Sequence, residues 1–175
     1  MKTIQKKVLL GATTILAMGV GAQTVEAATD SVSIQAIILD PVQITATEVL
    51  NFGSLTATTA GTVALDNADT LTPSAGITSV GGTITSGGFT LKGSTGRAID
   101  VTAPASVNIA CGADTMSVSA FTVDGGGVDI NATAFTRSLA AATETGFKLG
   151  GTLNVGAAQA AGTYTGSVTL TANYQ

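Results

Sequence analysis

The stretch AAGTYTGSVTLTANYQ, residues 160–175, alternates between two kinds of side chain from Tyr164 onward. Successive side chains of a β-strand point to opposite faces of the sheet, so a period of two predicts a strand with one buried and one solvated face. The first set of alternate positions holds Tyr164, Gly166, Val168, Leu170, Ala172 and Tyr174, and the second holds Thr165, Ser167, Thr169, Thr171 and Asn173.

A second alternating run lies near the other end of the chain. Its apolar positions are Val32, Ile34, Ala36 and Ile38, and the same parity continues into Val42, Ile44 and Ala46. Pro41 lacks the N–H that a strand interior needs, so the run is expected to divide there into two segments.

The chain between these runs also reads as short strands separated by Gly, Asn, Asp and Pro. No segment has a sustained 3.6-residue period, and only residues 138–145 could form a short helical turn before a late strand. We therefore predict an all-β fold, an immunoglobulin-like or pilin-like β-sandwich. The further expected strands are LNFGSL (50–55), TVALD (62–66), GITSV (76–80), FTLKG (89–93), RAIDVTAP (97–104), SVNIA (106–110), TMSVSAFTVD (115–124) and GFKLGGTLNV (146–155).

The first residues have the features of a secretory signal peptide. Lys2, Lys6 and Lys7 precede an apolar stretch over 8–21, and Val25-Glu26-Ala27 offers small residues at the positions that signal peptidase recognises. We expect cleavage after Ala27, which gives a signal peptide (1–27), an N-terminal extension (28–41) and one domain (42–175). The expected location is secreted or at the cell surface, reached through the periplasm, with no membrane span after cleavage.

The charge of the chain limits its partners. After removal of residues 1–27, four basic side chains face ten carboxylates, a net charge of −6, which argues against nucleic acid and anionic membranes. Charged residues make up 10% of the chain, where a soluble protein typically has about a quarter. So little surface charge favours self-association, and we expect a homo-oligomer or filament.

The chain offers little for catalysis or metal binding. It has no histidine, which removes the commonest general base and metal ligand, and it has one cysteine, Cys111, expected to be a small buried residue. The stretch Asp66-Asn67-Ala68-Asp69 lacks the spacing of a calcium loop and is interpreted as a turn, as are Gly125–Gly127 and Asp129. Asn131-Ala132-Thr133 is a glycosylation sequon whose use stays open. We expect no enzyme, no cofactor and no metal.

From Ser31 onward the sequence resembles an uncharacterised family of exported bacterial β-sandwich proteins, the domain of unknown function catalogued as 4402. The most specific part is GGTLNVGAAQAAGTYTGSVTLTANY (150–174), supported by LNFG (50–53), GTVALD (61–66), GGFTLKGSTGRAIDVTAP (87–104) and TMSVSAFTV (115–123). This family is distantly similar to spore-coat-U-type and chaperone–usher pilin subunits. That similarity implies an incomplete sandwich completed by a neighbour's N-terminal strand, with Tyr174 at the position of a common penultimate aromatic. It also raises a periplasmic chaperone and an outer-membrane usher as partners.

These observations lead to two main hypotheses. In the first, the protein is a non-enzymatic structural subunit of a surface fibre or pilus-like appendage. Its donor strand would carry Val32, Ile34, Ala36 and Ile38, and its acceptor edge Tyr164, Val168, Leu170 and Tyr174. The competing interpretation of residues 31–38 is a first strand paired within its own chain.

In the second hypothesis the protein is a monomeric, adhesin-like binding module that uses loops 66–75 and 124–137 of a closed sandwich. A hydrolase with paired carboxylates, Asp66 with Asp69 or Asp124 with Asp129, is the third and least supported alternative.

Overall fold

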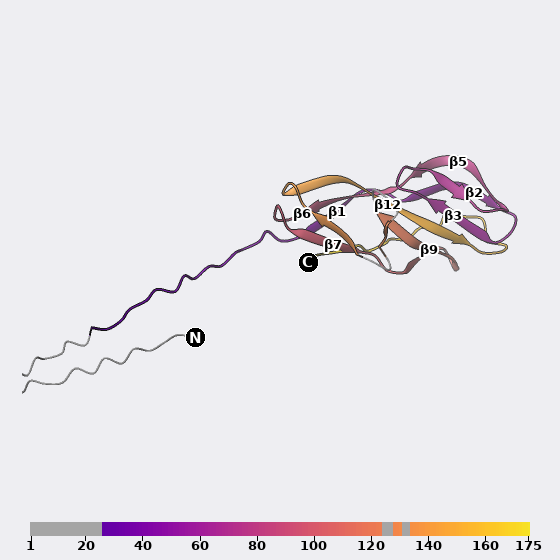
Figure 1. Ribbon diagram of the computed structural model, residues 1–175. Coiled ribbons are helices and arrows are strands. Elements are labelled where there is room, and N and C mark those ends of the chain that lie inside the picture. Colours follow the sequence, from indigo (N-terminus) through magenta and orange to yellow (C-terminus); the bar gives the residue numbers. More distant parts are fainter. Residues whose placement is uncertain (1–25, 124–127, 131–133) are drawn as a thin grey trace, which may run out of the picture. The chain divides into compact units, whose positions relative to one another are not determined.

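The computed structural model describes residues 26–123, 128–130 and 134–175. The chain divides into two units, Met1–Ala36 and Ile37–Gln175, and each is described by itself. In the first unit, residues 26–36 are exposed and contain no helix, strand or turn. The second unit is built from strands, and its described residues contain no helix, so the predicted all-β class is confirmed (Figure 1).

The strands occur in the following order along the chain. They are β1 (Gln43–Glu48), β2 (Asn51–Ala57), β3 (Gly61–Leu65), β4 (Leu71–Pro73), β5 (Ile77–Thr85), β6 (Gly87–Lys92), β7 (Ala98–Thr102), β8 (Ser106–Cys111), β9 (Asp114–Val123), β10 (Val128–Asp129), β11 (Phe135–Ser138), β12 (Thr143–Val155) and β13 (Thr171–Tyr174).

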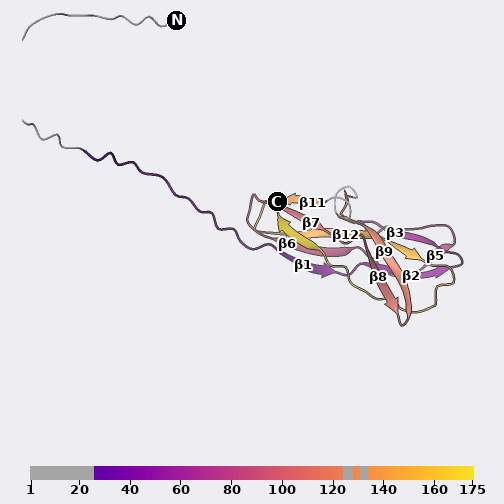
Figure 2. The same ribbon diagram turned by 90° about the horizontal axis from the view of Figure 1, so that it is seen from below.

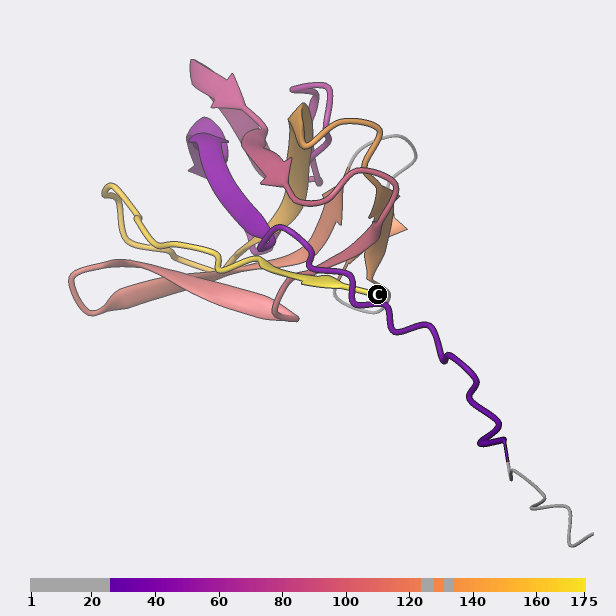
Figure 3. The same ribbon diagram turned by 90° about the vertical axis from the view of Figure 1, so that its left-hand side faces the viewer.

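The largest sheet has the order β1-β6-β12-β3-β4, and β9 joins it by pairing with β12, β8 and β10. The other two sheets are small: β11-β7-β13 and β2-β5. All pairings are antiparallel. The views from below and from the side show that the strands curl around a common interior (Figures 2 and 3).

The core is apolar and uses alternate residues of the strands. In β12, Phe147, Leu149, Leu153 and Val155 are all buried, and the polar Thr152 and Asn154 between them are half-buried. Phe89 of β6 stacks on Phe147 with ring centroids 5.4 Å apart. The full set of buried apolar residues is Phe52, Val63, Leu65, Ile77, Phe89, Leu91, Ile99, Val101, Val118, Phe121, Val123, Ile130, Leu139, Phe147, Leu149, Leu153 and Val155.

Most expected strands are present, with shifted ends, and three short ones, β4, β10 and β11, were not foreseen. The run over residues 31–46 was predicted as two strand segments, and only its second part became a strand, β1. The possible helical turn over 138–145 is wrong, because β11 ends at Ser138 and β12 begins at Thr143.

The glycine pair Gly81-Gly82 was interpreted as a break between strands, yet it lies inside β5. Both residues have positive φ, +108° and +87°, and the β2–β5 register shifts beside them at Ser54. Such a backbone fits a β-bulge, which bends a strand without ending it.

Candidate assembly edges

The terminal segment, defined here as residues 164–174, alternates in exposure from Ser167 onward, whereas Gly166, on the apolar side of the predicted pattern, is exposed. Tyr164, Val168, Leu170 and Tyr174, the four expected acceptor residues, are half-buried and share the side that faces the core, while the polar residues between them are exposed. Val168, Leu170 and Tyr174 pack against the buried cluster. The expected alternation is therefore present over residues 167–174.

The hydrogen-bonded ladder of the terminal segment covers fewer residues than its alternating sequence pattern. Thr165 bridges Ala110 of β8, and Thr171–Tyr174 (β13) pair with β7, but residues 166–170 between them belong to no strand. Figure 3 shows the yellow segment running along the β8 side of the domain. The bridge and the β7 ladder differ in register by two residues. This offset falls opposite the connection that contains Pro104, which has no N–H to donate.

Within the described residues, β13 has one ladder partner, β7, and forms an edge of its sheet (Figure 2). Gln175 donates its N–H to the Ala98 carbonyl. Because hydrogen-bonded and non-bonded pairs alternate in an antiparallel ladder, Asn173 also points its main-chain groups toward β7. Ala172 and Tyr174 point theirs to the opposite side, where another strand could pair.

This edge carries no electrostatic protection. Residues 149–175 contain no Asp, Glu, Lys or Arg and no Pro. Edge strands are usually guarded against pairing with other chains by charges, prolines, bulges or covering segments. The terminal segment has neither charges nor prolines, the two of these protective features that can be read directly from a sequence.

A second edge lies near the first. Among the described residues β1 pairs with β6 alone, and it comes close to β13. Ile44 of β1 and Val42 before it are half-buried and pack against the core, as Val168 and Leu170 do. The one charge in β1, Glu48, lies at its far end and pairs with Lys148. Two edges with half-buried apolar faces, the terminal segment without charge and β1 with its one charge at the far end, therefore lie close together.

The expected donor residues are the most exposed large apolar side chains of the protein's described part. Val32, Ile34 and Ile38 are 87%, 96% and 95% exposed, and Ala36 is exposed as well. Residues 26–42 contain no strand. Isolated exposed apolar residues are ordinary, but three of them alternating in one uncharged segment form a face with no cover.

Tyr174 also has a role that its sequence position did not reveal. Its hydroxyl accepts a hydrogen bond from the Ser94 N–H (2.6 Å) and donates one to the Asp40 carbonyl (2.7 Å). The Asp40 N–H in turn donates to Ser94 Oγ (2.8 Å). These three residues, called here the Tyr174 clasp, join the last strand, the loop after β6 and the residue three positions before β1. Sequence reasoning placed Tyr174 on the edge and missed Asp40 and Ser94.

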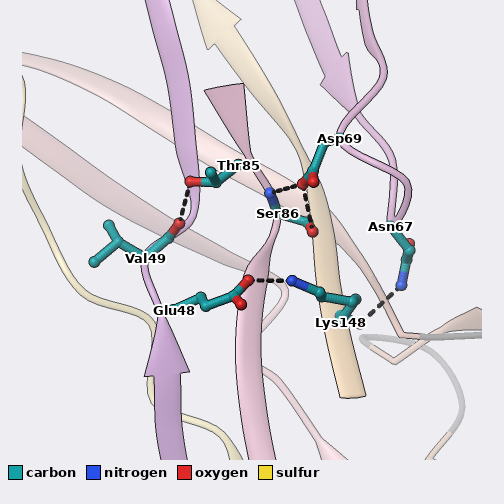
Figure 4. A network of polar contacts seen from close by, with 7 residues as sticks. All are labelled: Glu48, Val49, Asn67, Asp69, Thr85, Ser86 and Lys148. Carbon is teal, nitrogen blue, oxygen red and sulfur yellow. Dashed lines mark hydrogen bonds and ion pairs between the residues drawn. The ribbon is translucent and has the colours of Figure 1, made fainter. Parts of the chain in front are cut away.

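Asp66 and Asp69, two of the aspartates considered as catalytic or calcium-binding residues, accept hydrogen bonds within the domain. Asp66 Oδ1 accepts hydrogen bonds from the N–H groups of Ala68 and Thr70, each at 2.8 Å, the pattern of an Asx turn. Asp69, at φ +61°, accepts from the N–H and the hydroxyl of buried Ser86 (Figure 4). The Ser86 N–H, and next its hydroxyl, hold the pKa of the Asp69 carboxyl below its usual value of 3.8.

The rest of this polar network ties the same loop to the sheet. Asn67 donates its side-chain amide to the Lys148 carbonyl at 2.8 Å (Figure 4). Thr122 donates its hydroxyl to Asn67 Oδ1 at 3.0 Å. Lys148 pairs with Glu48. These contacts account for the conformation of the loop over 66–70, and they support its interpretation as a turn.

Several expectations fall outside the described residues: the signal segment over 1–25, the glycines 125–127 with Asp124, and the sequon residue Asn131. Cys111, expected to be buried, is a half-buried free thiol in β8. The part of the chain that the structure describes holds no group of three or more His, Cys, Asp or Glu arranged for a metal ion. Across residues 26–123, 128–130 and 134–175, no helix has the length and apolar character to cross a membrane.

Comparison with known proteins identifies a family without assigning it a function. A family model described as "Domain of unknown function (DUF4402)" matches residues 42–174. The match covers most of the chain, so the protein belongs to this family. It begins at Val42, eleven residues after the start of the resemblance noted in the sequence. Neither the curated proteins nor the solved structures contain a significant match.

Proposed function

We propose that this member of the DUF4402 family is an exported, non-enzymatic structural subunit of a surface fibre or pilus-like appendage, built on an incomplete immunoglobulin-like sandwich. Subunits assemble when residues 31–38 of one copy pair as a strand with the edge formed by the terminal segment of another copy. Adding a strand to an exposed sheet edge is a known mode of recognition, in which main-chain hydrogen bonds supply affinity and alternate side chains supply specificity.

One observation carries this proposal: the chain has an uncharged sheet edge with a half-buried apolar face, together with an uncharged alternating segment whose apolar face is fully exposed. Each feature supplies what the other lacks. The edge has main-chain groups that point away from β7, and the segment over 31–38 has no ladder of its own. Pairing leaves no buried charge, because neither partner carries one.

Burial of the inserted side chains does not by itself offset the entropy cost of ordering the donor segment. Burying Val32, Ile34 and Ile38 contributes about 1.5–3 kcal/mol each. Ordering eight residues costs about 1–2 kcal/mol each. The half-buried faces of Val168 and Leu170, covered in the same step, and the new ladder of hydrogen bonds supply the difference.

The test is a pair of substitutions at neighbouring positions of the donor segment. Ile34→Asp places a charge on the apolar face, and Gln35→Asp places the same charge on the opposite face. Sedimentation velocity over a range of concentrations should show that Ile34→Asp and deletion of residues 28–39 abolish association, whereas Gln35→Asp retains it. Equal association of the deletion variant and the full mature chain would refute strand donation.

A different result would favour the binding module. If the unaltered mature protein sediments as a monomer at every concentration, the edges do not recruit a second copy. The terminal edge would then have no assembly role, and ligand binding by the loops would become the better explanation.

A further inference from the structure

We infer that the Tyr174 clasp keeps residues 31–38 from folding back along β1 of the same molecule, and so reserves them for a second copy. This inference rests on the proposed function. It adds the contact that favours pairing of residues 31–38 with another copy over pairing within the same molecule. It follows from which groups of Asp40 the clasp occupies.

A segment that folds back beside β1 has to reverse direction within residues 39–42, since β1 begins at Gln43. The sequence favours a turn there, because Asp at the first position and Pro at the second are typical of a type I turn. In that turn the Asp40 carbonyl accepts a hydrogen bond from the N–H three residues later, which belongs to Gln43. When the paired strands continue from the turn, the Asp40 N–H also enters the ladder.

The clasp engages both of these groups. Tyr174 donates to the Asp40 carbonyl, and Ser94 Oγ accepts from the Asp40 N–H, so the orientation of Asp40 is set by residues far away in the sequence. The structure has no turn over residues 39–42, despite the favourable sequence.

The surroundings of Tyr174 make room for its hydroxyl. A Cβ on Gly93 would lie 2.8 Å from the Tyr174 hydroxyl oxygen, and also 3.0 Å from Ile99 Cδ1. Only glycine at position 93 leaves this space. Because Tyr174 lies on β13, the clasp forms only when the terminal segment is in place on β7. The donor is therefore restrained in a molecule whose acceptor edge is already formed.

The test compares Tyr174→Phe with Tyr164→Phe, the same chemical change at the other tyrosine of the terminal segment. Among the described residues Tyr164 hydrogen-bonds to Gln159 and Ala160, both within five positions of it. Both variants keep the aromatic ring. Two quantities are measured on the full mature chain: hydrogen exchange of residues 31–38 in dilute monomer, and the association constant from sedimentation.

In the unaltered protein and in Tyr164→Phe, the amides of residues 31–38 should exchange at the rate of an unstructured peptide. In Tyr174→Phe they should be protected tenfold or more, and association should weaken by at least tenfold. Equally fast exchange in dilute Tyr174→Phe and in the unaltered monomer overturns the clasp. This readout needs no assembly, so it decides the clasp even if deletion of residues 28–39 leaves association unchanged and strand donation fails.

A second variant covers the case in which Tyr174→Phe does not fold. Ser94→Ala removes only the acceptor of the Asp40 N–H and leaves the ring and hydroxyl of Tyr174 in place. It should also raise the protection of residues 31–38 from hydrogen exchange, by about threefold. Exchange that stays at the unprotected rate in folded Ser94→Ala contradicts the inference.

Discussion

Individual side chains of this protein act mainly through hydrogen bonds to the main chain. Asp66, Asp69, Ser94 and Tyr174 each bond to a backbone group at least two residues away. Neutral hydrogen bonds of this kind contribute about 0.5–1.5 kcal/mol each, and bonds to a charged group more. With few charged residues, the domain depends on such contacts to hold its loops against the sheets.

At the residue scale, we expect stability to fall in acid. Hydrogen bonds from Ser86 lower the pKa of Asp69, and those from the Ala140 N–H, and next from Arg137, lower that of Glu144. A carboxyl whose pKa is lowered by folding stabilises the fold fully above its unfolded value, 3.8 for Asp and 4.5 for Glu. This contribution is lost as the pH falls through the lower, folded value.

Urea unfolding between pH 8 and pH 2 measures this dependence. Asp69→Asn and Glu144→Gln should each flatten the curve below pH 4.5 and leave its slope above pH 6 unchanged. A slope below pH 4.5 equal to that of the unaltered protein would show that other carboxyls dominate. Asp30→Asn, in the exposed segment over 26–36, is the control and should change nothing.

A second prediction at this scale concerns Gly150 in β12. A Cβ on Gly150 would lie 2.6 Å from the Leu65 carbonyl oxygen and 2.7 Å from Thr122 Oγ1, so Gly150→Ala forces backbone to move. We expect a loss of about 1–3 kcal/mol in the free energy of unfolding. Gly156→Ala meets only the flexible end of Gln159 and should stay within about 0.5 kcal/mol. Equal values for the two variants would contradict the close approach at Gly150.

At the scale of elements, the terminal segment shows that side chains can alternate in exposure where no ladder of main-chain hydrogen bonds forms. Its side chains alternate in exposure from Ser167 to Tyr174, because alternation needs only an extended chain over a core. Its pairing depends on the strands beside it in the same molecule. There, Pro104 lies in the connection between β7 and β8. The result is a single bridge at Thr165, a ladder over Thr171–Tyr174, and residues 166–170 between them in no strand.

The orientation of β13 yields a prediction about its edge. The Ala172 N–H points away from β7, so Ala172→Pro should leave the β7 ladder intact and remove a donor from the outer edge. We expect a folded domain by circular dichroism and an association constant at least tenfold lower. Asn173→Pro, which removes an N–H directed at β7, should instead destabilise the domain. Unchanged association of Ala172→Pro would place the contact between copies elsewhere.

At the scale of the whole molecule, the folding core and the N-terminal segment are separable. Among the residues that the structure describes, every buried apolar one lies at Phe52 or later, and the family match begins at Val42. Residues 26–38 contribute exposed side chains alone. A segment that adds nothing to the core of its own chain is available for contact with another molecule.

This separation predicts the thermal stability of the truncated protein. Deletion of residues 28–39 should change the Tm by less than about 2 °C when both proteins are measured as monomers, because it removes no core contact. At high concentration the full mature chain should melt higher than the deletion variant, since association stabilises the folded state by mass action. A large fall in Tm of the dilute deletion variant would show instead that residues 28–39 belong to the core.

Local sequence patterns were enough to predict the all-β class, the position of most strands and the alternation over residues 167–174, because side-chain alternation is a local property of an extended chain. They also identified 31–38 as an apolar face. Only the tertiary structure decided which strands pair, where β5 bulges and which residues surround Tyr174. The three members of the clasp are 54, 80 and 134 residues apart along the chain. Hydrogen bonds over such separations depend on how the sheets fold together, and no local pattern records them.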